Sequence, residues 1–308
     1  MRKLLGVMLL LVLAGCGGGD DGDKPAPAPP SRFDYDRSAD VGFEDAGRVN
    51  RNYPIQIRQV SYASPGGRGR VTGFLVRPPG KGPFPGVLLM HGAAGDSRQM
   101  IVQATWLAGR GAVALAIDSP FARNPNRQLP QGVPGLRAES DLIAQNVVEL
   151  RRAVDVLTEE GDADAERIAF VGFSGGARTG AILAGNEDRI RAYVLMSAGS
   201  PPVAEIVKAV PVEARVDVEE ILTGVDPLVH IRKAEPAKLL FLNGRRDQVV
   251  PRAALNALYR NASEPKEIRW YATTHEPTVA VYRDMLAWLT KELGLRTEPV
   301  AEGVRIGP

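Results

Sequence analysis

A serine in a glycine-flanked turn is the residue of this chain best suited to nucleophilic chemistry. Residues 172–176 read GFSGG, which fits G-x-S-x-G, and they lie between the apolar stretch Arg167–Phe173 and a segment rich in Ala and Gly. A sharp strand-to-helix turn lifts a serine hydroxyl clear of the backbone, and glycines allow the neighbouring chain to pack closely. The pattern predicts that Ser174 is a nucleophile. The alternative is a glycine-rich turn with a solvent-facing serine.

A serine hydroxyl is a weak nucleophile and needs an adjacent base. The chain has three histidines. His275 lies between the last expected strand and the last expected helix, which gives the chain order serine, acid, base. His91 lies in a different motif, and His230 lies upstream of the best candidate acid. We therefore predict that His275 takes the proton from Ser174.

The base needs a carboxylate that orients its ring. Asp247 follows an apolar stretch, 238–243, and a glycine turn, so it is expected at the same sheet edge as the serine. Some proteins of this architecture place the acid one strand earlier, but the stretch 192–196 is followed by no carboxylate before Glu205. Glu276, next to the base, is a weaker rival. Asp247 is the predicted acid, and a surface aspartate beside two arginines is the alternative.

A glycine-rich loop after an earlier strand supplies candidate oxyanion donors. Residues 91–95 read HGAAG. Acyl transfer passes through a tetrahedral oxyanion, and each backbone N–H that binds it is worth roughly 3 kcal/mol. One donor is expected on the residue after the nucleophile, Gly175, and the other in this loop. We predict Ala93, with Ala94 as the alternative, and expect His91 to brace the loop rather than move protons.

The elements that must position these residues alternate between strands and helices. Continuous apolar runs predict strands covered on both faces, as in a parallel sheet. The sequence therefore predicts an α/β fold with a mostly parallel, doubly wound sheet, interrupted by a small insertion at 199–237 that is either a lid or a structural loop. The expected strands are Ile55–Tyr62, Arg70–Arg77, Gly86–Met90, Ala112–Ile117, Arg167–Phe173, Ala192–Met196, Lys238–Asn243 and Glu267–Tyr271, and the expected helices are Met100–Arg110, Glu139–Glu159 and Thr278–Leu293.

The first sixteen residues have the features of an export signal. Arg2 and Lys3 precede an apolar run, 4–13, that is too short to span a bilayer. The run ends in LAGC at 13–16, which resembles the lipobox of bacterial lipoproteins, and Cys16 is the only cysteine of the chain. We expect residues 1–15 to be a signal peptide and Cys16 to carry a lipid that holds the protein to the cell envelope. The alternative is an ordinary secretory signal.

The remaining chain divides into a tether, one domain and a tail. Residues 16–32 are rich in Gly, Pro and Ala and are expected to be a solvated spacer. Residues 33–295 are expected to form the folded domain and 296–308 a C-terminal tail. An exported protein with Gly at position 17 is expected at the outer membrane if the source has one. The sequence leaves the oligomeric state open.

Composition excludes several classes of protein. The 308 residues carry a net charge of +2 without a dense Lys/Arg run, which argues against a nucleic-acid partner. A single cysteine excludes an intrachain disulfide. With only three histidines beside it, a Cys/His metal site is not expected.

Five segments of the chain carry a family resemblance, namely Met90–Gly92, Ala116–Pro120, Arg151–Asp155, Arg167–Ser174 and Asp247–Pro251. Together they resemble the dienelactone hydrolase-like and acetyl-xylan-esterase-like α/β hydrolases. The likeness covers about 53–295 and implies the α/β-hydrolase fold, hydrolysis of a carboxylic ester through an acyl-enzyme, and no cofactor. It also implies a triad of Ser174, Asp247 and His275 and an oxyanion hole at Ala93 and Gly175. An exported enzyme of this kind is expected to act on a small-molecule or acylated-polymer ester.

The chain departs from this family in two ways. Dienelactone hydrolases use a cysteine nucleophile, whereas the only cysteine of this chain is Cys16 in the lipobox. A serine esterase is therefore the better interpretation. Gly175 stands where bulkier residues are frequent, which leaves the size of the acyl pocket open. A serine peptidase or amidase of the same fold is one alternative. A non-catalytic surface-binding lipoprotein that kept the fold is another.

Overall fold

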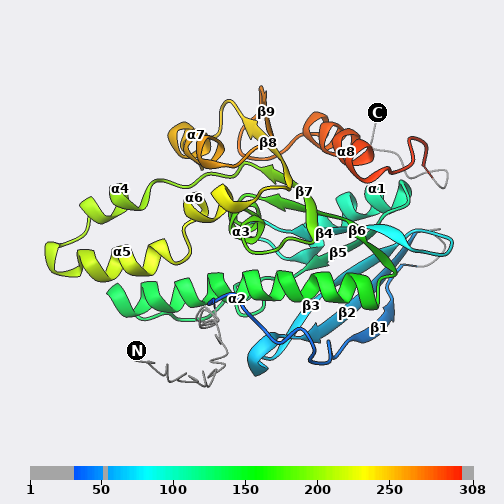
Figure 1. The fold of residues 1–308 in the computed structure, drawn as a ribbon, viewed down its shortest axis with the longest axis horizontal. Coiled ribbons are helices and arrows are strands. Elements are labelled where there is room, and N and C mark those ends of the chain that lie inside the picture. Colours follow the sequence, from blue (N-terminus) through cyan, green and yellow to red (C-terminus); the bar gives the residue numbers. More distant parts are fainter. Residues whose placement is uncertain (1–30, 51–54, 300–308) are drawn as a thin grey trace, which may run out of the picture. The chain divides into compact units, whose positions relative to one another are not determined.

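A nine-stranded sheet forms the centre of the part of the chain that the structure describes (Figure 1). The structure is a computed structural model and describes residues 31–50 and 55–299, so Cys16 and the expected signal peptide lie outside it. The strand order is β1-β2-β3-β5-β4-β6-β7-β8-β9. The strands are β1 (Glu44–Arg48), β2 (Gln56–Ala63), β3 (Arg70–Arg77), β4 (Phe84–Met90), β5 (Val113–Ile117), β6 (Ala163–Phe173), β7 (Ile190–Met196), β8 (Lys238–Gly244) and β9 (Lys266–Tyr271).

The strands that carry the site are parallel. β5, β4, β6, β7, β8 and β9 pair in parallel, whereas β1, β2 and β3 join β5 through antiparallel pairs. Every residue of β4 and β5 is buried, as the apolar runs predicted. Parallel strands end at one edge of a sheet, so the loops after β4, β6, β7, β8 and β9 gather there.

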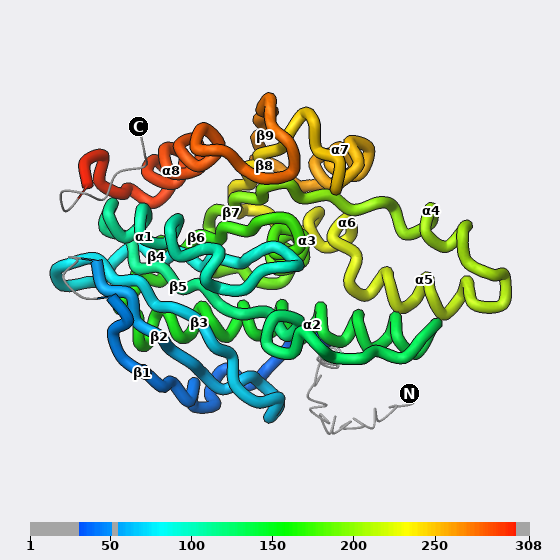
Figure 2. The backbone as a smooth tube through the Cα atoms, turned by 180° about the vertical axis from the view of Figure 1, so that it is seen from behind, coloured from blue at the N-terminus to red at the C-terminus, as the bar shows by residue number. Residues whose placement is uncertain are grey.

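Helices cover both faces of the sheet (Figures 1 and 2). Because side chains alternate along a strand, Leu88 packs toward one face and its neighbours Val87 and Leu89 toward the other. The first face is covered by α2 (Gly132–Glu159), α3 (Gly175–Ala184) and α7 (Arg252–Asn261), and the second by α1 (Ile101–Gly109) and α8 (Val279–Leu293). The predicted doubly wound α/β-hydrolase fold is confirmed.

Several elements begin earlier than predicted, and two elements were not predicted. Strand β6 begins at Ala163 and not at Arg167. The helix expected from Glu139 begins already at Gly132. Strand β1 was not predicted because its residues EDAGR are mostly exposed and carry no apolar alternation. Helix α7, after the candidate acid, was also missed.

The expected insertion at 199–237 is helical. It contains α4 (Val203–Lys208), α5 (Arg215–Thr223) and α6 (Pro227–His230). Helices α4 and α5 extend beyond the sheet in both views, while α6 packs against α3 (Figures 1 and 2). The segment contacts α2, where the Ser140 hydroxyl donates to the Ile221 carbonyl at 3.3 Å.

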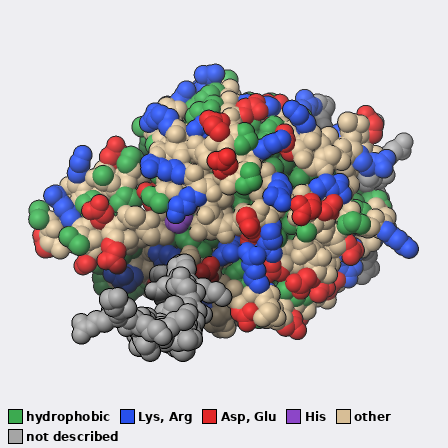
Figure 3. Space-filling view, in the orientation of Figure 1, with side chains coloured by type: hydrophobic (Ala, Val, Ile, Leu, Met, Phe, Trp, Pro, Cys, Tyr) green, Lys and Arg blue, Asp and Glu red, His purple; other side chains and the backbone are tan. Residues whose placement is uncertain are grey.

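The described surface is polar and mixed in charge. Lys and Arg side chains alternate with Asp and Glu side chains over the face drawn in Figure 3. Among residues 31–50 and 55–299, no helix is both long and apolar enough to cross a membrane.

Candidate active site

Ser174 occupies a strained turn between β6 and α3. Its backbone φ is 50° and its ψ is −113°, a region that costs free energy for any residue with a side chain. Its N–H donates to the Met196 carbonyl at 2.9 Å, which ties the turn to the end of β7. A Cβ on Gly172 would lie 2.7 Å from the Ala177 backbone, and one on Gly176 would lie 2.4 Å from the His91 carbonyl oxygen. These two positions therefore require glycine.

His275 bridges the serine and the predicted acid. Its Nε2 lies 2.8 Å from Ser174 Oγ and its Nδ1 lies 2.9 Å from Asp247 Oδ2. The other carboxylate oxygen of Asp247 accepts the N–H groups of Val249 and Val250, both at 2.9 Å. Since a carboxylate only accepts, Nδ1 carries the ring proton and Nε2 is free to accept the serine proton. The structure thus brings the three predicted residues into one hydrogen-bonded chain.

The three side chains differ in their exposure to solvent. The Asp247 side chain is 1% exposed, the His275 side chain 12%, and Ser174 is half-buried. The Phe173 ring lies 5.2 Å from the imidazole, centroid to centroid. Asp247, rather than the exposed neighbour Glu276, makes the contact to the imidazole. A buried acid, a shielded base and an accessible hydroxyl are the arrangement that proton transfer to an incoming substrate requires.

The loop after β4 faces the residue after the serine. A Cβ on Gly175 would lie 3.0 Å from both the backbone nitrogen and the Cβ of Ala93, and its three nearest atoms all belong to Ala93. The Gly92 N–H is occupied, because it donates to Gln99 Oε1 at 2.9 Å. This favours Ala93 over Ala94 as the loop residue next to Gly175. The two backbones could bind one oxyanion between them.

His91 holds two loops of the sheet edge together. It is 2% exposed, its Nδ1 lies 2.7 Å from the Gly92 carbonyl oxygen, and its Nε2 accepts the Ser119 N–H at 3.1 Å. Burial lowers the pKa of His91, which keeps the ring neutral and able to accept that bond. These contacts agree with the expected bracing role. The third histidine, His230, contacts Asn186 and the Phe33 ring and makes no contact with the triad.

A pocket of about 220 Å³ lies beside the candidate oxyanion hole. Ala93 and Gly175 line it together with the apolar side chains of Ile143 and Ile182, and its lining also includes the charged residues Glu139 and Arg178. Pro227 of α6 is a lining residue as well, so one residue of the 199–237 segment helps to form the pocket. Such a pocket can hold a substrate group next to the serine.

Sequence reasoning missed two residues that support the site. Gln99 holds the loop before Ala93, and the Ser197 hydroxyl donates to the His275 carbonyl oxygen at 2.7 Å. No motif marks either residue, and both act through contacts between distant loops. Within residues 31–50 and 55–299 there is also no group of three or more His, Cys, Asp or Glu side chains that could hold a metal ion.

The sequence of residues 38–217 matches the model of a known family, described as Esterase FrsA-like. The chain belongs to the FrsA-like esterase family. The matched range contains Ala93, Ser174 and Gly175, and it ends before Asp247 and His275.

Curated members of the FrsA-like family match about half of this chain. Esterase FrsA of Enterobacter sp. (strain 638) is 31% identical over 149 residues, which are 47% of this chain and 32% of that protein. Esterase FrsA of Shigella boydii serotype 18 is 30% identical over 160 residues, which are 49% of this chain and 36% of that protein. The chain spans about a third of the length of the curated relatives it matches.

Solved structures with this fold include two acetyl xylan esterases. The enzyme from Paenibacillus sp. R4 has a TM-score of 0.69 at 22% identity and covers 83% of this chain and 90% of its own. The enzyme from Thermoanaerobacterium sp. JW/SL YS485 has a TM-score of 0.70 at 19% identity and covers 84% of this chain and 90% of its own. At this identity the likeness is one of fold. It agrees with the resemblance to α/β-hydrolase esterases drawn from the sequence.

Proposed function

We propose that this FrsA-like protein hydrolyses carboxylic esters through an acyl-enzyme on Ser174. The observation that carries the proposal is the position of His275, whose two ring nitrogens lie 2.8 Å from the Ser174 hydroxyl and 2.9 Å from the Asp247 carboxylate. This chain of contacts joins three loops from the same edge of the sheet. A structural role for Ser174 explains neither the strained φ of 50° nor a base aimed at its hydroxyl.

The proposed reaction has two halves. In the first, His275 Nε2 takes the Ser174 proton while Oγ attacks the ester carbonyl, and the N–H groups of Gly175 and Ala93 bind the oxyanion. The imidazolium then protonates the leaving alcohol as the ester C–O bond breaks, which leaves the acyl group on Ser174. In the second half, His275 takes a proton from water, the hydroxide attacks the acyl-enzyme, and Ser174 recovers its proton as the acid leaves. Asp247 holds the ring in place throughout.

The substrate is proposed to be a small-molecule ester or an ester group on a polymer. The pocket beside Gly175 is of limited volume, about 220 Å³, so a short or medium group fits it better than a long chain. The triad needs no cofactor for this chemistry.

The proposal is tested by hydrolysis of p-nitrophenyl esters from acetyl to palmitoyl. Ser174→Ala and His275→Ala are each expected to lower kcat/KM by roughly a thousandfold or more at an unchanged Tm. Ser38→Ala, on the exposed N-terminal segment, is the matched control and should keep full activity. p-Nitroanilides run in parallel test the amidase alternative. If no ester is turned over and a fluorophosphonate leaves Ser174 unlabelled, the proposal is wrong and a binding role becomes the better one.

We also propose that Cys16 carries the lipid that tethers the protein to the cell envelope, on the strength of the LAGC motif and the Gly/Pro-rich stretch after it. Cys16→Ser should shift the protein from the detergent phase to the aqueous phase in a Triton X-114 partition. Equal partition of parent and variant would contradict the proposal.

A further inference from the structure

We propose that Ser197 is a positioning residue of this active site, which holds the backbone of the base while catalysis proceeds; this rests on the proposed function. Ser197 directly follows β7 and is 3% exposed. Its hydroxyl donates to the carbonyl oxygen of His275 at 2.7 Å. Some proteins of this fold place the acid after this strand, and here the first residue after the strand makes a hydrogen bond to the base loop instead.

The end of β7 is the point where the three catalytic loops meet. The Met196 carbonyl accepts the N–H of Ser174 at 2.9 Å, which fixes the nucleophile turn. The next N–H, that of Ser197, donates to the Leu242 carbonyl at 3.0 Å, in the strand that leads to Asp247. The Ser197 hydroxyl adds the third link, to His275. Two consecutive residues thus bind the elements that carry the nucleophile, the acid and the base.

The imidazole by itself does not fix the base loop. The contacts to Asp247 and Ser174 hold only the tip of the His275 side chain, while its main chain lies in the loop between β9 and α8. Arg246 holds the start of the loop, through bonds of 3.0 Å to the Thr273 carbonyl and 2.7 Å to the Ala272 carbonyl. The bond from Ser197 holds the main chain at His275 itself. Without it this part of the loop can shift while the ring keeps one partner and loses the other. Since reacting groups must stay in a narrow range of geometry, a small shift lowers the rate more than it lowers substrate binding.

The backbone of Ser197 supports a functional role. Its φ is 52°, a left-handed value that disfavours residues with a side chain. Glycine at this position would relieve the strain, yet a side chain with a hydroxyl is present. Strain of this kind persists at functional sites where the surrounding structure enforces it. Because glycine removes the hydroxyl and the strain together, activity and stability should change in opposite directions.

The experiment compares Ser197→Gly with a matched variant, Asp162→Gly. Asp162 has a φ of 56° and lies between α2 and β6, where it contacts no triad residue. Both variants relieve a left-handed backbone, and only the first removes a bond to His275. For Ser197→Gly we expect kcat to fall about tenfold or more with KM within twofold and Tm unchanged or higher. For Asp162→Gly we expect kcat to be unchanged.

A second measurement does not depend on turnover. The His275 Nδ1–H proton should give a downfield NMR signal in the parent protein and a broadened or lost signal in Ser197→Gly. A sharp signal together with kcat within twofold of the parent would overturn the positioning role. So would a fall in kcat accompanied by an equal fall in the folded fraction. If the parent turns over no ester, the proposed function fails, and the NMR comparison still decides the role of Ser197.

Discussion

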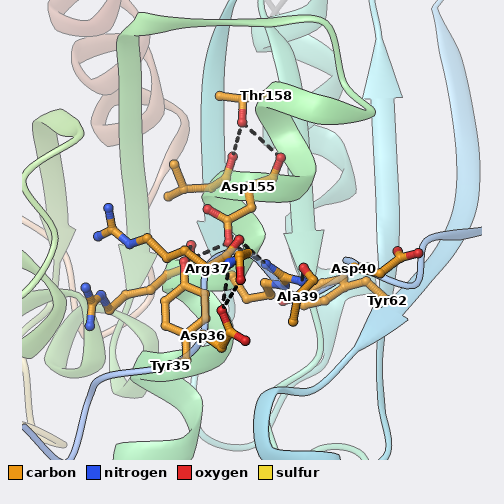
Figure 4. Close-up of polar contacts among 12 residues, drawn as sticks. Tyr35, Asp36, Arg37, Ala39, Asp40, Tyr62, Asp155 and Thr158 are labelled. Carbon is orange, nitrogen blue, oxygen red and sulfur yellow. Dashed lines mark hydrogen bonds and ion pairs between the residues drawn. The ribbon is translucent and has the colours of Figure 1, made fainter. Parts of the chain in front are cut away.

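The candidate triad and a cluster of ion pairs on α2 are both networks of hydrogen-bonded side chains, and the differences between them explain why we propose the triad, and not the cluster, as the active site. The α2 clamp, as we name the cluster, fastens the segment after Ser31 to helix α2 (Figure 4). The α2 clamp consists of Tyr35, Arg151, Arg152, Asp155, Glu187 and Arg189.

Each carboxylate of the α2 clamp has several charged partners. Asp155 accepts the Tyr35 hydroxyl at 2.7 Å and Arg152 at 3.0 Å through one oxygen, and pairs with Arg189 at 2.5 Å through the other. Arg189 also forms two bonds of 2.7 Å with Glu187. Burial and the bond to Asp155 raise the pKa of Tyr35 to about 12, so its hydroxyl stays a donor. The charges of this cluster are paired within the protein, although Arg151 Nε makes no hydrogen bond and lies 3.5 Å from Glu187 as an ion pair only.

The candidate triad differs from the clamp because one of its groups, the Ser174 hydroxyl, is left accessible. Its serine has a partly exposed hydroxyl beside a pocket, a strained backbone and a base as its partner. Only its acid, with two backbone N–H groups and the imidazole, resembles the saturated groups of the clamp. Buried charges that are paired within the protein serve the fold, whereas a nucleophile must be accessible to the substrate. Variants in the two regions should therefore separate activity from stability.

The largest expected effect is that of Asp247→Asn. An amide can donate to Nδ1 and so favours the wrong tautomer of His275, which should lower kcat about ten-thousand-fold while Tm changes little. Steady-state hydrolysis of a p-nitrophenyl ester measures the loss. Asp188→Asn, an exposed aspartate outside the site, is the control and should keep full activity. A residual rate above a tenth of the parent's would show that Asp247 does not orient the base.

Asp155→Ala should lower the stability of the protein and leave its activity unchanged. The Asp155 side chain is 5% exposed, so its removal leaves the buried Arg152 cation without that partner and should cost about 3–5 kcal/mol in the free energy of unfolding. Urea denaturation measures this, and kcat per folded molecule should stay at the parent value. Asp164→Ala breaks a half-buried surface i,i+3 pair with Arg167 and should cost about 1 kcal/mol or less. Equal costs for the two variants would contradict the distinction between clamp and surface.

Gly175→Ala should reduce activity through the oxyanion hole. The added methyl group would lie 3.0 Å from the Ala93 nitrogen and press the two backbones apart, so kcat should fall roughly ten- to a hundredfold. Gly176→Ala is the contrasting variant, because its methyl group would lie 2.4 Å from the His91 carbonyl oxygen and should lower Tm instead. Unchanged kcat in Gly175→Ala would place the oxyanion elsewhere.

The smallest expected effect is a dependence of stability on pH that comes from His91, beside the candidate active site, and not from the clamp. Burial lowers the pKa of His91 below the value of about 6.5 that the unfolded chain has. The unfolded state then binds more protons, so the free energy of unfolding falls as pH decreases through about 6.5, by at most about 1.4 kcal/mol per unit. The arginines of the clamp do not titrate in this range.

His91→Gln tests the pH effect, because its amide oxygen can still accept the Ser119 N–H. Urea denaturation at pH 7.5, 6.5 and 5.5 should show a smaller loss of stability for this variant than for the parent. The assignment to His91 is wrong if both proteins lose the same free energy over this range.

The fold and the nucleophile followed from local patterns. The unbroken apolar runs that became β4 and β5 and the glycines around Ser174 report directly on burial and on a tight turn, since both depend on nearby residues. The order of Ser174, Asp247 and His275 was likewise enough to single out three residues, which the structure then brought within hydrogen-bond distance. An alternating sheet with its loops at one edge leaves few other arrangements.

What the sequence could not supply is whatever depends on contacts between distant segments. The link from Ser197 to His275 spans 78 positions, and the bond from Tyr35 to Asp155 spans 120. Neither residue type nor spacing indicates that a serine at a strand end holds a base, or that Asp155 belongs to a clamp. Sequence by itself determined the parallel part of the sheet, the turn around Ser174 and the choice of the three candidate triad residues, because these follow from local periodicity and residue type. The tertiary structure alone decided which loops meet at the end of β7 and which charges are saturated, because both depend on packing in three dimensions.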